Sequence, residues 1–168
     1  RYYKYGNFSS TGSEINILYG NEWQRVMAYY STVTDNGAFY GVMRKSDLEN
    51  IKMKDQMGTD WYMIAEIAFL GKIKTLNSVF VHRDLGGATE SYDNIASLLS
   101  VTGFQKAFPH IAVAINGFQE VAWLNNSFSR KNSIIRYVVA ISLFNLVLFK
   151  KALRPFISRN VRKIVNKT

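Results

Sequence analysis

The 168-residue chain has no cysteine, two prolines and two histidines. The absence of cysteine excludes disulfides, thiolate nucleophiles and zinc–cysteine sites, and it suits a reducing compartment. Neither a phosphate-cradling glycine-rich motif nor a Ser-His-Asp pattern is present, and Asp55 and Asp60 lack the spacing of a metal site. Hydrophobic residues nevertheless make up 48% of the chain and aromatic residues 14%, so it can bury a real core and global disorder is excluded. The length suits one domain, or one domain with an appendage.

Acidic residues are missing from the last part of the chain. From Val121 to Thr168 there are ten Lys or Arg and no Asp or Glu, whereas the first 120 residues hold eleven bases and twelve acids. The net charge of +9 therefore belongs to the C-terminal part. Such a basic tail predicts an acidic partner surface, either anionic lipid or nucleic acid.

The tail also carries a long apolar run, Tyr137–Phe149, with basic residues on both sides. The run is shorter than the roughly 20 apolar residues of a membrane-spanning helix. After Pro155 an amphipathic pattern typical of an interfacial helix follows, in which one face holds Ile157, Val161, Ile164 and Val165. We therefore predict two parts: residues 1–125 form a domain, and residues 126–168 form a basic helical tail associated with a membrane.

Hydrophobic periodicity in the first part mixes helices and strands, which predicts an α/β or α+β fold. Asn21 is the expected N-cap of the first helix, Gly71 the expected C-cap of the second, and Asp35-Asn36-Gly37 a turn. The second helix is apolar nearly all round, so we expect it to be buried. The expected helices are Asn21–Tyr30, Trp61–Leu70, Ile95–Gly103 and Phe108–Leu124, with a short one opening at a Ser46–Glu49 capping box; the expected strands are Ala38–Met43 and Lys74–Val81.

Asp60 stands at the start of the buried helix and has two interpretations. Either Asp60 or Thr59 is the N-cap, accepting a backbone N–H bond and facing the helix dipole. Alternatively the carboxylate points into a cleft and removes a proton from an attacking hydroxyl, and the helix N-terminus keeps it ionised. Spacing alone favours the cap.

The other candidate residues have similar pairs of interpretations. His82, at the end of an expected strand, is either a surface residue or a group that binds a metal or a diphosphate. Arg83 beside it pairs with a sheet-edge charge or with phosphate oxygens. Trp61 is either core or a platform for a sugar face. Arg44 either forms a surface ion pair or holds a phosphate, and the glycine-containing loop after Asp84 is a candidate lid.

Four segments together resemble family 2 glycosyltransferases over about residues 23–92. Phe39-Tyr40-Gly41-Val42-Met43-Arg44 resembles their aromatic-Gly-x-x-Arg strand, and Gly58-Thr59-Asp60-Trp61 resembles their Gly-x-Asp-Trp motif. Ala65–Ile73 is similar to the Leu-Ala-x-x-Gly-x-Ile that follows. His82-Arg83-Asp84-Leu85-Gly86-Gly87-Ala88-Thr89 is similar to their His-Arg-x-x-Gly-Gly-x-Ser/Thr segment.

The resemblance implies a GT-A fold and inverting transfer of a sugar from a nucleotide diphosphate to the hydroxyl of a saccharide or lipid-linked acceptor. It implies that Asp60 is the base and that His82 lies near a divalent metal, Mn or Mg, that holds the diphosphate. The residues implied to bind substrate are Trp61, Arg44, Arg83, Gly86 and Gly87. It also implies a cytoplasmic enzyme of cell-envelope polysaccharide synthesis, peripheral at the inner face of the membrane.

The chain departs from the family in two respects. Thr59 stands where many members carry Glu. The nucleotide-binding first strand and the Asp-x-Asp metal motif are absent, and the chain starts at Arg1 with a stretch typical of a protein interior. We therefore expect a C-terminal, acceptor-side fragment that is inactive on its own.

Two other functions fit the composition. The chain could be a non-catalytic module that docks on a membrane surface or a partner through its apolar run. Nucleic-acid binding is disfavoured, because the bases flank the apolar run rather than interleave with exposed aromatics and no recognition motif is present.

Overall fold

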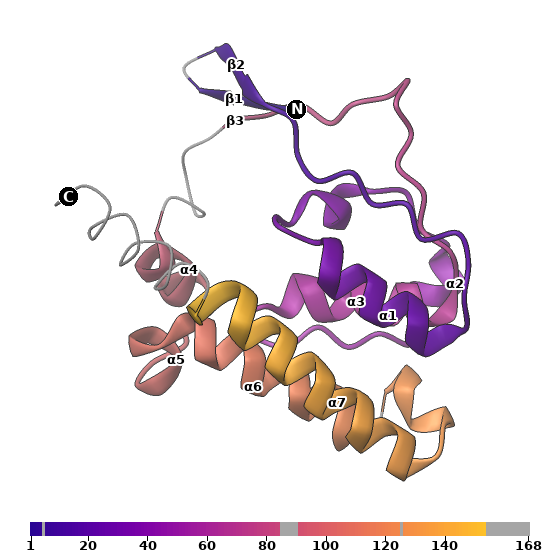
Figure 1. The fold of residues 1–168 in the computed structure, drawn as a ribbon. Helices are drawn as coiled ribbons and strands as arrows, with labels where there is room; N and C mark the ends of the chain where they lie inside the picture. The colour runs from indigo at the N-terminus through magenta and orange to yellow at the C-terminus, as the bar shows by residue number, and fades with distance from the viewer. Residues whose placement is uncertain (5, 85–90, 125, 154–168) are drawn as a thin grey trace, which may run out of the picture.

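The computed structural model describes residues 1–4, 6–84, 91–124 and 126–153. It is mixed α/β, about 55% helical, with a small three-stranded sheet, which confirms the predicted mixed class. Figure 1 shows the sheet at one end of the molecule, above a body of helices. The described helices are α1 (Glu22–Thr32), α2 (Lys45–Leu48), α3 (Thr59–Leu70), α4 (Tyr92–Leu98), α5 (Phe104–Ala107), α6 (Pro109–Ala122) and α7 (Ser133–Leu148), with 3₁₀ turns at Gly37–Tyr40 and Ser127–Arg130 and a π-helical turn at Phe149–Leu153.

Helix α1 forms where the apolar periodicity predicts it. Asn21 is its N-cap, as expected, and shares a capping box with Gln24, whose side chain accepts from the Asn21 backbone N–H at 2.8 Å. The prediction of α6 is also confirmed, with Pro109 in its first turn. Helix α4 begins earlier than predicted, at Tyr92, and ends at Leu98. The short helix α2 is present, but the predicted Ser46 capping box is wrong, because Arg44 is the N-cap and no side chain caps it.

Both predicted strands are wrong. The segment Ala38–Met43 is not buried; Gly37–Tyr40 forms a 3₁₀ turn and Val42 is fully exposed. In place of the strand Lys74–Val81 the chain is irregular, with a turn at Asn77–Ser78 and no ladder, and an Ile17–Ile73 bridge lies just before it. Apolar and β-branched composition predicts strands, but a strand also needs a neighbour to pair with, and these segments pair with none among the described residues.

The sheet forms instead from the N-terminus, where the sequence has few clear signals. Its strands are β1 (Tyr2–Lys4), β2 (Asn7–Ser10) and β3 (Arg83–Asp84), in the order β2-β1-β3. Strand β1 is antiparallel to β2 and parallel to β3, with Tyr2 opposite Arg83. The sheet therefore brings Arg83 close to the first residues of the chain.

Helix α3 is the centre of the core and is buried nearly all round, as predicted. It packs against α1, and Arg25 of α1 donates to the carbonyl oxygens of Ala68 and Phe69 at 2.8 Å, which satisfies the last turn of α3. Gly71 is the C-cap, as predicted, with an extended backbone that any residue could adopt. The largest fully buried side chains around it are Tyr29, Tyr30, Phe128, Met57 and Leu143.

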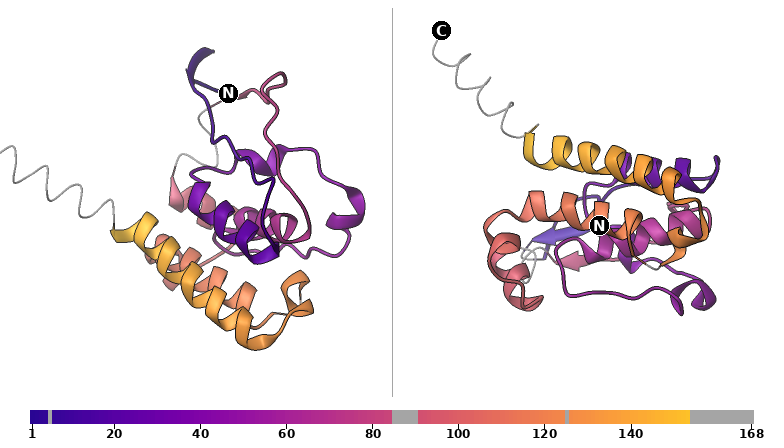
Figure 2. Two further views of the ribbon diagram at one scale, coloured as in Figure 1. Left: turned by 45° about the vertical axis from the view of Figure 1, so that its right-hand side comes forward. Right: turned by 90° about the horizontal axis from the view of Figure 1, so that it is seen from below.

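Helix α7 contains the apolar run and packs along α6 (Figures 1 and 2). One face of α7, formed by Arg136, Ala140, Leu143 and Val147, is buried. The helical stretch Ser133–Lys151 is long and apolar enough to cross a membrane by length and composition alone, a test that core helices of soluble proteins also pass. The amphipathic pattern after Pro155 lies outside the described residues, and the boundary between 1–125 and 126–168 stays a prediction.

Candidate functional site

Gly58 sets the direction in which the chain enters α3. Its backbone is left-handed, with φ 85° and ψ 13°, and it is the N-cap of the helix. A Cβ at this position would lie 2.7 Å from the hydroxyl oxygen of Tyr62 and 3.1 Å from a methyl carbon of Val113. Conformation and space both require glycine here. Neither Thr59 nor Asp60 is the N-cap, so that interpretation of Asp60 is wrong; Asp60 lies in the first turn instead.

An ion pair and hydrogen bonds hold the loop before α3 against α6. Glu120, which is buried, accepts from Lys54 Nζ at 2.8 Å and from Gln56 Nε2 at 2.7 Å. The Met57 carbonyl oxygen accepts from the Tyr62 hydroxyl at 2.8 Å and from Asn116 Nδ2 at 3.2 Å. These bonds hold the start of α3, and with it Asp60, in one position.

Replacing Gly58 with alanine is expected to destabilise the protein. The left-handed conformation alone costs a non-glycine residue roughly 1–3 kcal/mol, and the overlap with Tyr62 adds to this. Gly71→Ala, at the other end of the same helix, is the matched control, because its Cβ meets nothing within 4 Å. Urea unfolding should show a clear loss for Gly58→Ala and little change for Gly71→Ala. Equal stabilities would contradict the role given to Gly58.

Asp60 is partly buried among polar groups from three segments. Its carboxylate accepts from the Trp61 backbone N–H at 3.0 Å, and Asn36 also donates to it. Burial raises the pKa of Asp60, and these hydrogen bonds and the positive charge of Arg83 oppose the rise without cancelling it. The shift runs against the expectation that the helix N-terminus lowers this pKa, because burial outweighs the dipole. A raised pKa makes the carboxylate a better proton acceptor.

Asn36 joins Asp60 to Arg83. The Arg83 guanidinium donates to Asn36 Oδ1 at 2.8 Å and lies 4.1 Å from the centroid of the Tyr40 ring, a cation–π contact. The predicted site residues Asp60, Trp61 and Arg83 are thus brought together. The sequence predicts only a turn at Asn36, because no local pattern indicates that its amide lies between the carboxylate and the guanidinium.

Asp35 holds that turn in place. It accepts from the Ser13 backbone N–H and the Gly37 backbone N–H at 2.7 Å each, and from the Ser13 hydroxyl at 2.8 Å. Burial works to raise the pKa of Asp35, but hydrogen bonds from Ser13, Gly37 and Tyr2 outweigh it, and the net shift is downward. Asp35 is therefore a second carboxylate in this region, kept ionised by its donors.

Arg44 and His82 lie apart from Asp60 and Arg83, whereas Trp61 directly follows Asp60 in α3. Trp61 is buried in the core, although one ring face touches Lys151. Arg44 is exposed at the start of α2, where the described ion pair joins Lys45 to Glu49 at 3.9 Å.

His82 is exposed, its ring 5.1 Å from that of Tyr3, beside a cavity of about 210 Å³ that Arg83 and Asp84 also line. Within the described residues no group of three His, Asp or Glu could hold a metal ion. Gly86 and Gly87, and with them the candidate lid, lie outside the described residues.

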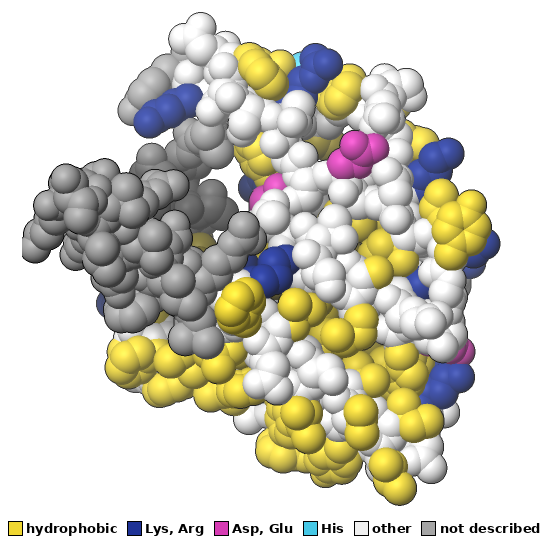
Figure 3. Space-filling view, viewed as in Figure 1, with side chains coloured by type: hydrophobic (Ala, Val, Ile, Leu, Met, Phe, Trp, Pro, Cys, Tyr) yellow, Lys and Arg dark blue, Asp and Glu magenta, His cyan; other side chains and the backbone are white. Residues whose placement is uncertain are grey.

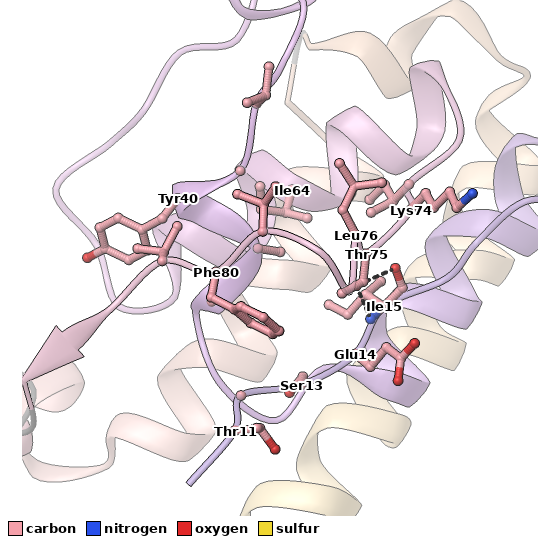
Figure 4. A pocket seen from close by; sticks show the side chains of 18 of the residues that line it. Thr11, Ser13, Glu14, Ile15, Tyr40, Ile64, Lys74, Thr75, Leu76 and Phe80 are labelled. Atoms are coloured by element: carbon pink, nitrogen blue, oxygen red, sulfur yellow. Dashed lines mark hydrogen bonds between the residues drawn. The ribbon is translucent and has the colours of Figure 1, made fainter. Parts of the chain in front are cut away.

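A groove of about 630 Å³ adjoins the group formed by Asp60, Asn36, Arg83 and Tyr40, the Asp60 cluster. Figure 4 shows Tyr40 and Phe80 on one side of it and Ile15, Thr75 and Leu76 on the other. Arg83 and Tyr40 line the groove and also belong to the Asp60 cluster, whereas Asp60 itself is not among the lining residues. The groove is therefore lined by aromatic rings and is connected to Asp60 only through Arg83 and Asn36.

No protein-family model, curated protein or solved structure matches the chain.

Proposed function

We propose that the chain is the acceptor-side part of an inverting, GT-A-type glycosyltransferase of family 2, in which Asp60 is the general base. The observation that supports this best is the placement of Asp60. It is a partly buried carboxylate with a raised pKa, held at the start of a rigid buried helix and joined through Asn36 to Arg83. These residues occupy the positions that the family motifs assign to the base and to a substrate contact.

The reaction would be a direct displacement. An acceptor hydroxyl gives its proton to an Asp60 carboxylate oxygen, and the acceptor oxygen forms a bond to the anomeric carbon of the donor sugar. The bond from that carbon to the diphosphate breaks, its electron pair leaves with the nucleoside diphosphate, and the anomeric configuration inverts. Positioning and proton transfer are the contributions of this chain.

The described residues do not form a site for the divalent metal that the resemblance implies. His82 and Asp84 line the small cavity beside β3, but the described residues hold no third acidic or histidine ligand there. We therefore assign no metal-dependent step to this chain. Donor and metal binding would belong to the donor-binding half.

A saccharide acceptor suits the groove. Carbohydrate rings present apolar C–H faces, and the groove is lined by the aromatic rings of Tyr40 and Phe80, of which one face each is covered by Arg83 and Arg1 respectively. Arg83 at its edge could place the acceptor towards Asp60.

The test is acceptor-dependent release of nucleoside diphosphate. The protein that joins this chain to a donor-binding half is incubated with a panel of nucleotide sugars and with saccharide or lipid-linked acceptors. We expect release with one donor, increased by an acceptor, and none from the chain alone. Absence of release across the panel, from a folded protein that binds a nucleotide sugar, would favour the non-catalytic module.

A peripheral membrane location at the cytoplasmic face is a second part of the proposal, and the exposed face of α7 supports it. Ile134, Val138 and Ile141 are 72%, 60% and 53% exposed. Figure 3 shows hydrophobic side chains gathered over the lower part of the molecule, where α5, α6 and α7 lie in Figure 1. A non-catalytic docking module would use the same surface.

The described bases of the tail contribute less to membrane binding than the sequence suggests. Lys131 pairs with Glu22 at 2.8 Å, and Arg136 is buried and donates to the Val121 and Leu124 carbonyl oxygens. In the described part of the tail, the apolar face of α7 would therefore make most of the contact with the membrane.

Replacing the three exposed residues Ile134, Val138 and Ile141 with glutamine is expected to weaken vesicle binding by more than tenfold. The vesicles contain anionic and zwitterionic phospholipid. The loss is large because each apolar side chain that becomes buried in lipid contributes about 1.5–3 kcal/mol. Lys131→Gln, which removes one charge at the same helix end, should change binding little. Cosedimentation measures both. Unchanged binding by the triple variant would reject this face of α7 as the membrane contact.

A further inference from the structure

Lys151 reaches the start of α3 from the far end of the chain. It lies in the π-helical turn after α7, and its Nζ is 4.4 Å from the centroid of the Trp61 ring. The same atom is 3.4 Å from the Thr34 carbonyl oxygen, next to Asp35. Trp61 directly follows Asp60, so the ammonium group lies against the indole of the residue next to the candidate base in the first turn of α3.

The neighbouring Lys150 fixes this arrangement. Its Nζ donates to the carbonyl oxygens of Tyr30, Ser31 and Val33 at 2.9, 2.9 and 3.0 Å. These are the last carbonyl groups of α1 and of its C-cap, where a cation is favoured. The end of α7 is thereby held on the end of α1, and Lys151 is presented to Trp61.

Charges from several elements surround Lys151. Burial lowers the pKa of its ammonium group, and the carboxylates of Asp35 and Asp60 oppose that shift. His110 of α6 lies near enough that Lys151 adds to the lowering of its pKa, after burial. Lys151 is therefore a partly desolvated cation near both carboxylates of the site.

The positive charge of Arg83 on β3 works to lower the pKa of Asp60, and the Asp60 carboxylate in turn works to raise the pKa of Lys151. Three tyrosines, Tyr29, Tyr30 and Tyr62, also lie within electrostatic reach of Asp60, and burial raises their pKa so that they stay neutral. Arg83 is thus a cation that favours ionised Asp60, and the electrostatic link between Asp60 and Lys151 brings the end of α7 to the same region.

We propose that Lys151 is a positioning residue of the candidate site, which covers one face of the Trp61 indole and favours the carboxylate form of Asp60. The effect of Lys151 on sugar transfer rests on the proposed function. Its electrostatic effect on Asp60 does not depend on that function. The C-terminal helix would then complete the site as well as lie at the surface. No local sequence pattern connects these residues, because Lys151 is far from Asp60 along the chain.

The coupling can be measured without a substrate. The side-chain carboxyl carbons of Asp and Glu are followed by NMR through a pH titration of the chain and its variants. We expect Lys151→Met to raise the pKa of Asp60 by roughly half a unit, as loss of a nearby opposite charge requires. Lys151→Arg keeps the charge and should leave the pKa of Asp60 near its original value.

Lys131→Met is the matched control. A hydrogen bond from Lys131 is the largest cause of the lowered pKa of Glu22, so this variant should raise the pKa of Glu22 and leave Asp60 unchanged. If Glu22 responds to Lys131→Met but Asp60 does not respond to Lys151→Met, the proposal is overturned. Lys151→Gln makes the same test of charge with a polar side chain if the methionine variant fails to fold.

In the active transferase, Lys151→Met should lower kcat with little change in the KM of the donor and shift the acid limb of the kcat/KM profile to higher pH. A uniform fall in activity with an unchanged pH profile would indicate a merely structural role and would contradict the proposal. If the transferase proposal itself fails, the NMR titration still reports on the pair of Lys151 and Asp60.

Discussion

In the proposed transferase, the Asp60→Asn variant is expected to lose transfer activity by roughly 10²- to 10⁴-fold in kcat, the usual contribution of a general base. An asparagine keeps the shape of the side chain and can still accept the Trp61 N–H bond, but it cannot take up the acceptor proton. The KM of the donor should change little, because the donor is proposed to bind elsewhere. Asp55→Asn, at an exposed position in the preceding loop, is the control and should keep full activity.

The stability of the same variant has a predictable pH dependence. Because burial raises the pKa of Asp60, its contribution to stability is fully present below the unfolded-state pKa and is lost as the pH rises through the folded-state pKa. Asn has no such ionisation, so Asp60→Asn should be relatively more stable at neutral pH than in acid. Thermal unfolding at several pH values measures this. A variant that is both inactive and destabilised at neutral pH would point to a structural role for Asp60.

Replacing Leu143 with alanine is expected to cost about 2–5 kcal/mol of unfolding free energy, as for other fully buried leucines. Leu143 is 1% exposed and lies on the face of α7 that joins the main core. The expected loss follows if α7 belongs to the folded body rather than to a separate membrane tail. Urea unfolding of the chain, followed by circular dichroism, gives the free energy.

Ile141→Ala is the matched control for Leu143→Ala. Ile141 lies on the same helix but is 53% exposed, so its truncation should change stability by within about 0.5 kcal/mol. A similar small effect for both variants would mean that α7 does not pack as the structure describes. The two residues thus separate the buried face of the helix from the face proposed to meet lipid.

The helices with a clear apolar period could be predicted from the sequence, and the strands could not. Asn21 and Gly71 mark the ends of α1 and α3 through local preferences that act within one turn. A strand depends on a partner elsewhere in the chain, and Val79 and Phe80, which have the right composition, find none among the described residues. They are left 68% and 43% exposed.

The apolar run of α7 shows the limit of composition. A helix that is apolar on most of its surface is typical both of a membrane helix and of a core helix. Leu143 and Val147 join α7 to the core, although only 22% of the apolar stretch is buried. The basic residues that follow the run suggested an anionic surface. In the described part of the tail, Lys150 contacts carbonyl oxygens and Lys151 an indole ring, while the anionic surface stays a prediction.

About half of the candidate site could be anticipated. Asp60, Trp61 and Arg83 belong to motifs that place them near one another, and the structure brings them together. Asn36 and Lys151 contribute through tertiary contacts, and neither their spacing nor their neighbours in the sequence indicate them. Gly58 is a part of the motif whose reason becomes clear only from its left-handed backbone and the Tyr62 ring beside it.

One NMR time course tests base-catalysed transfer at Asp60 most directly. The transferase and its Asp60→Asn variant are followed in parallel with the same nucleotide sugar and acceptor, using the anomeric proton signals. We predict that the unaltered protein forms a glycoside of inverted configuration in step with nucleoside diphosphate, and that the variant forms almost none. The same product at a similar rate from both proteins, or a product of retained configuration, would contradict this mechanism.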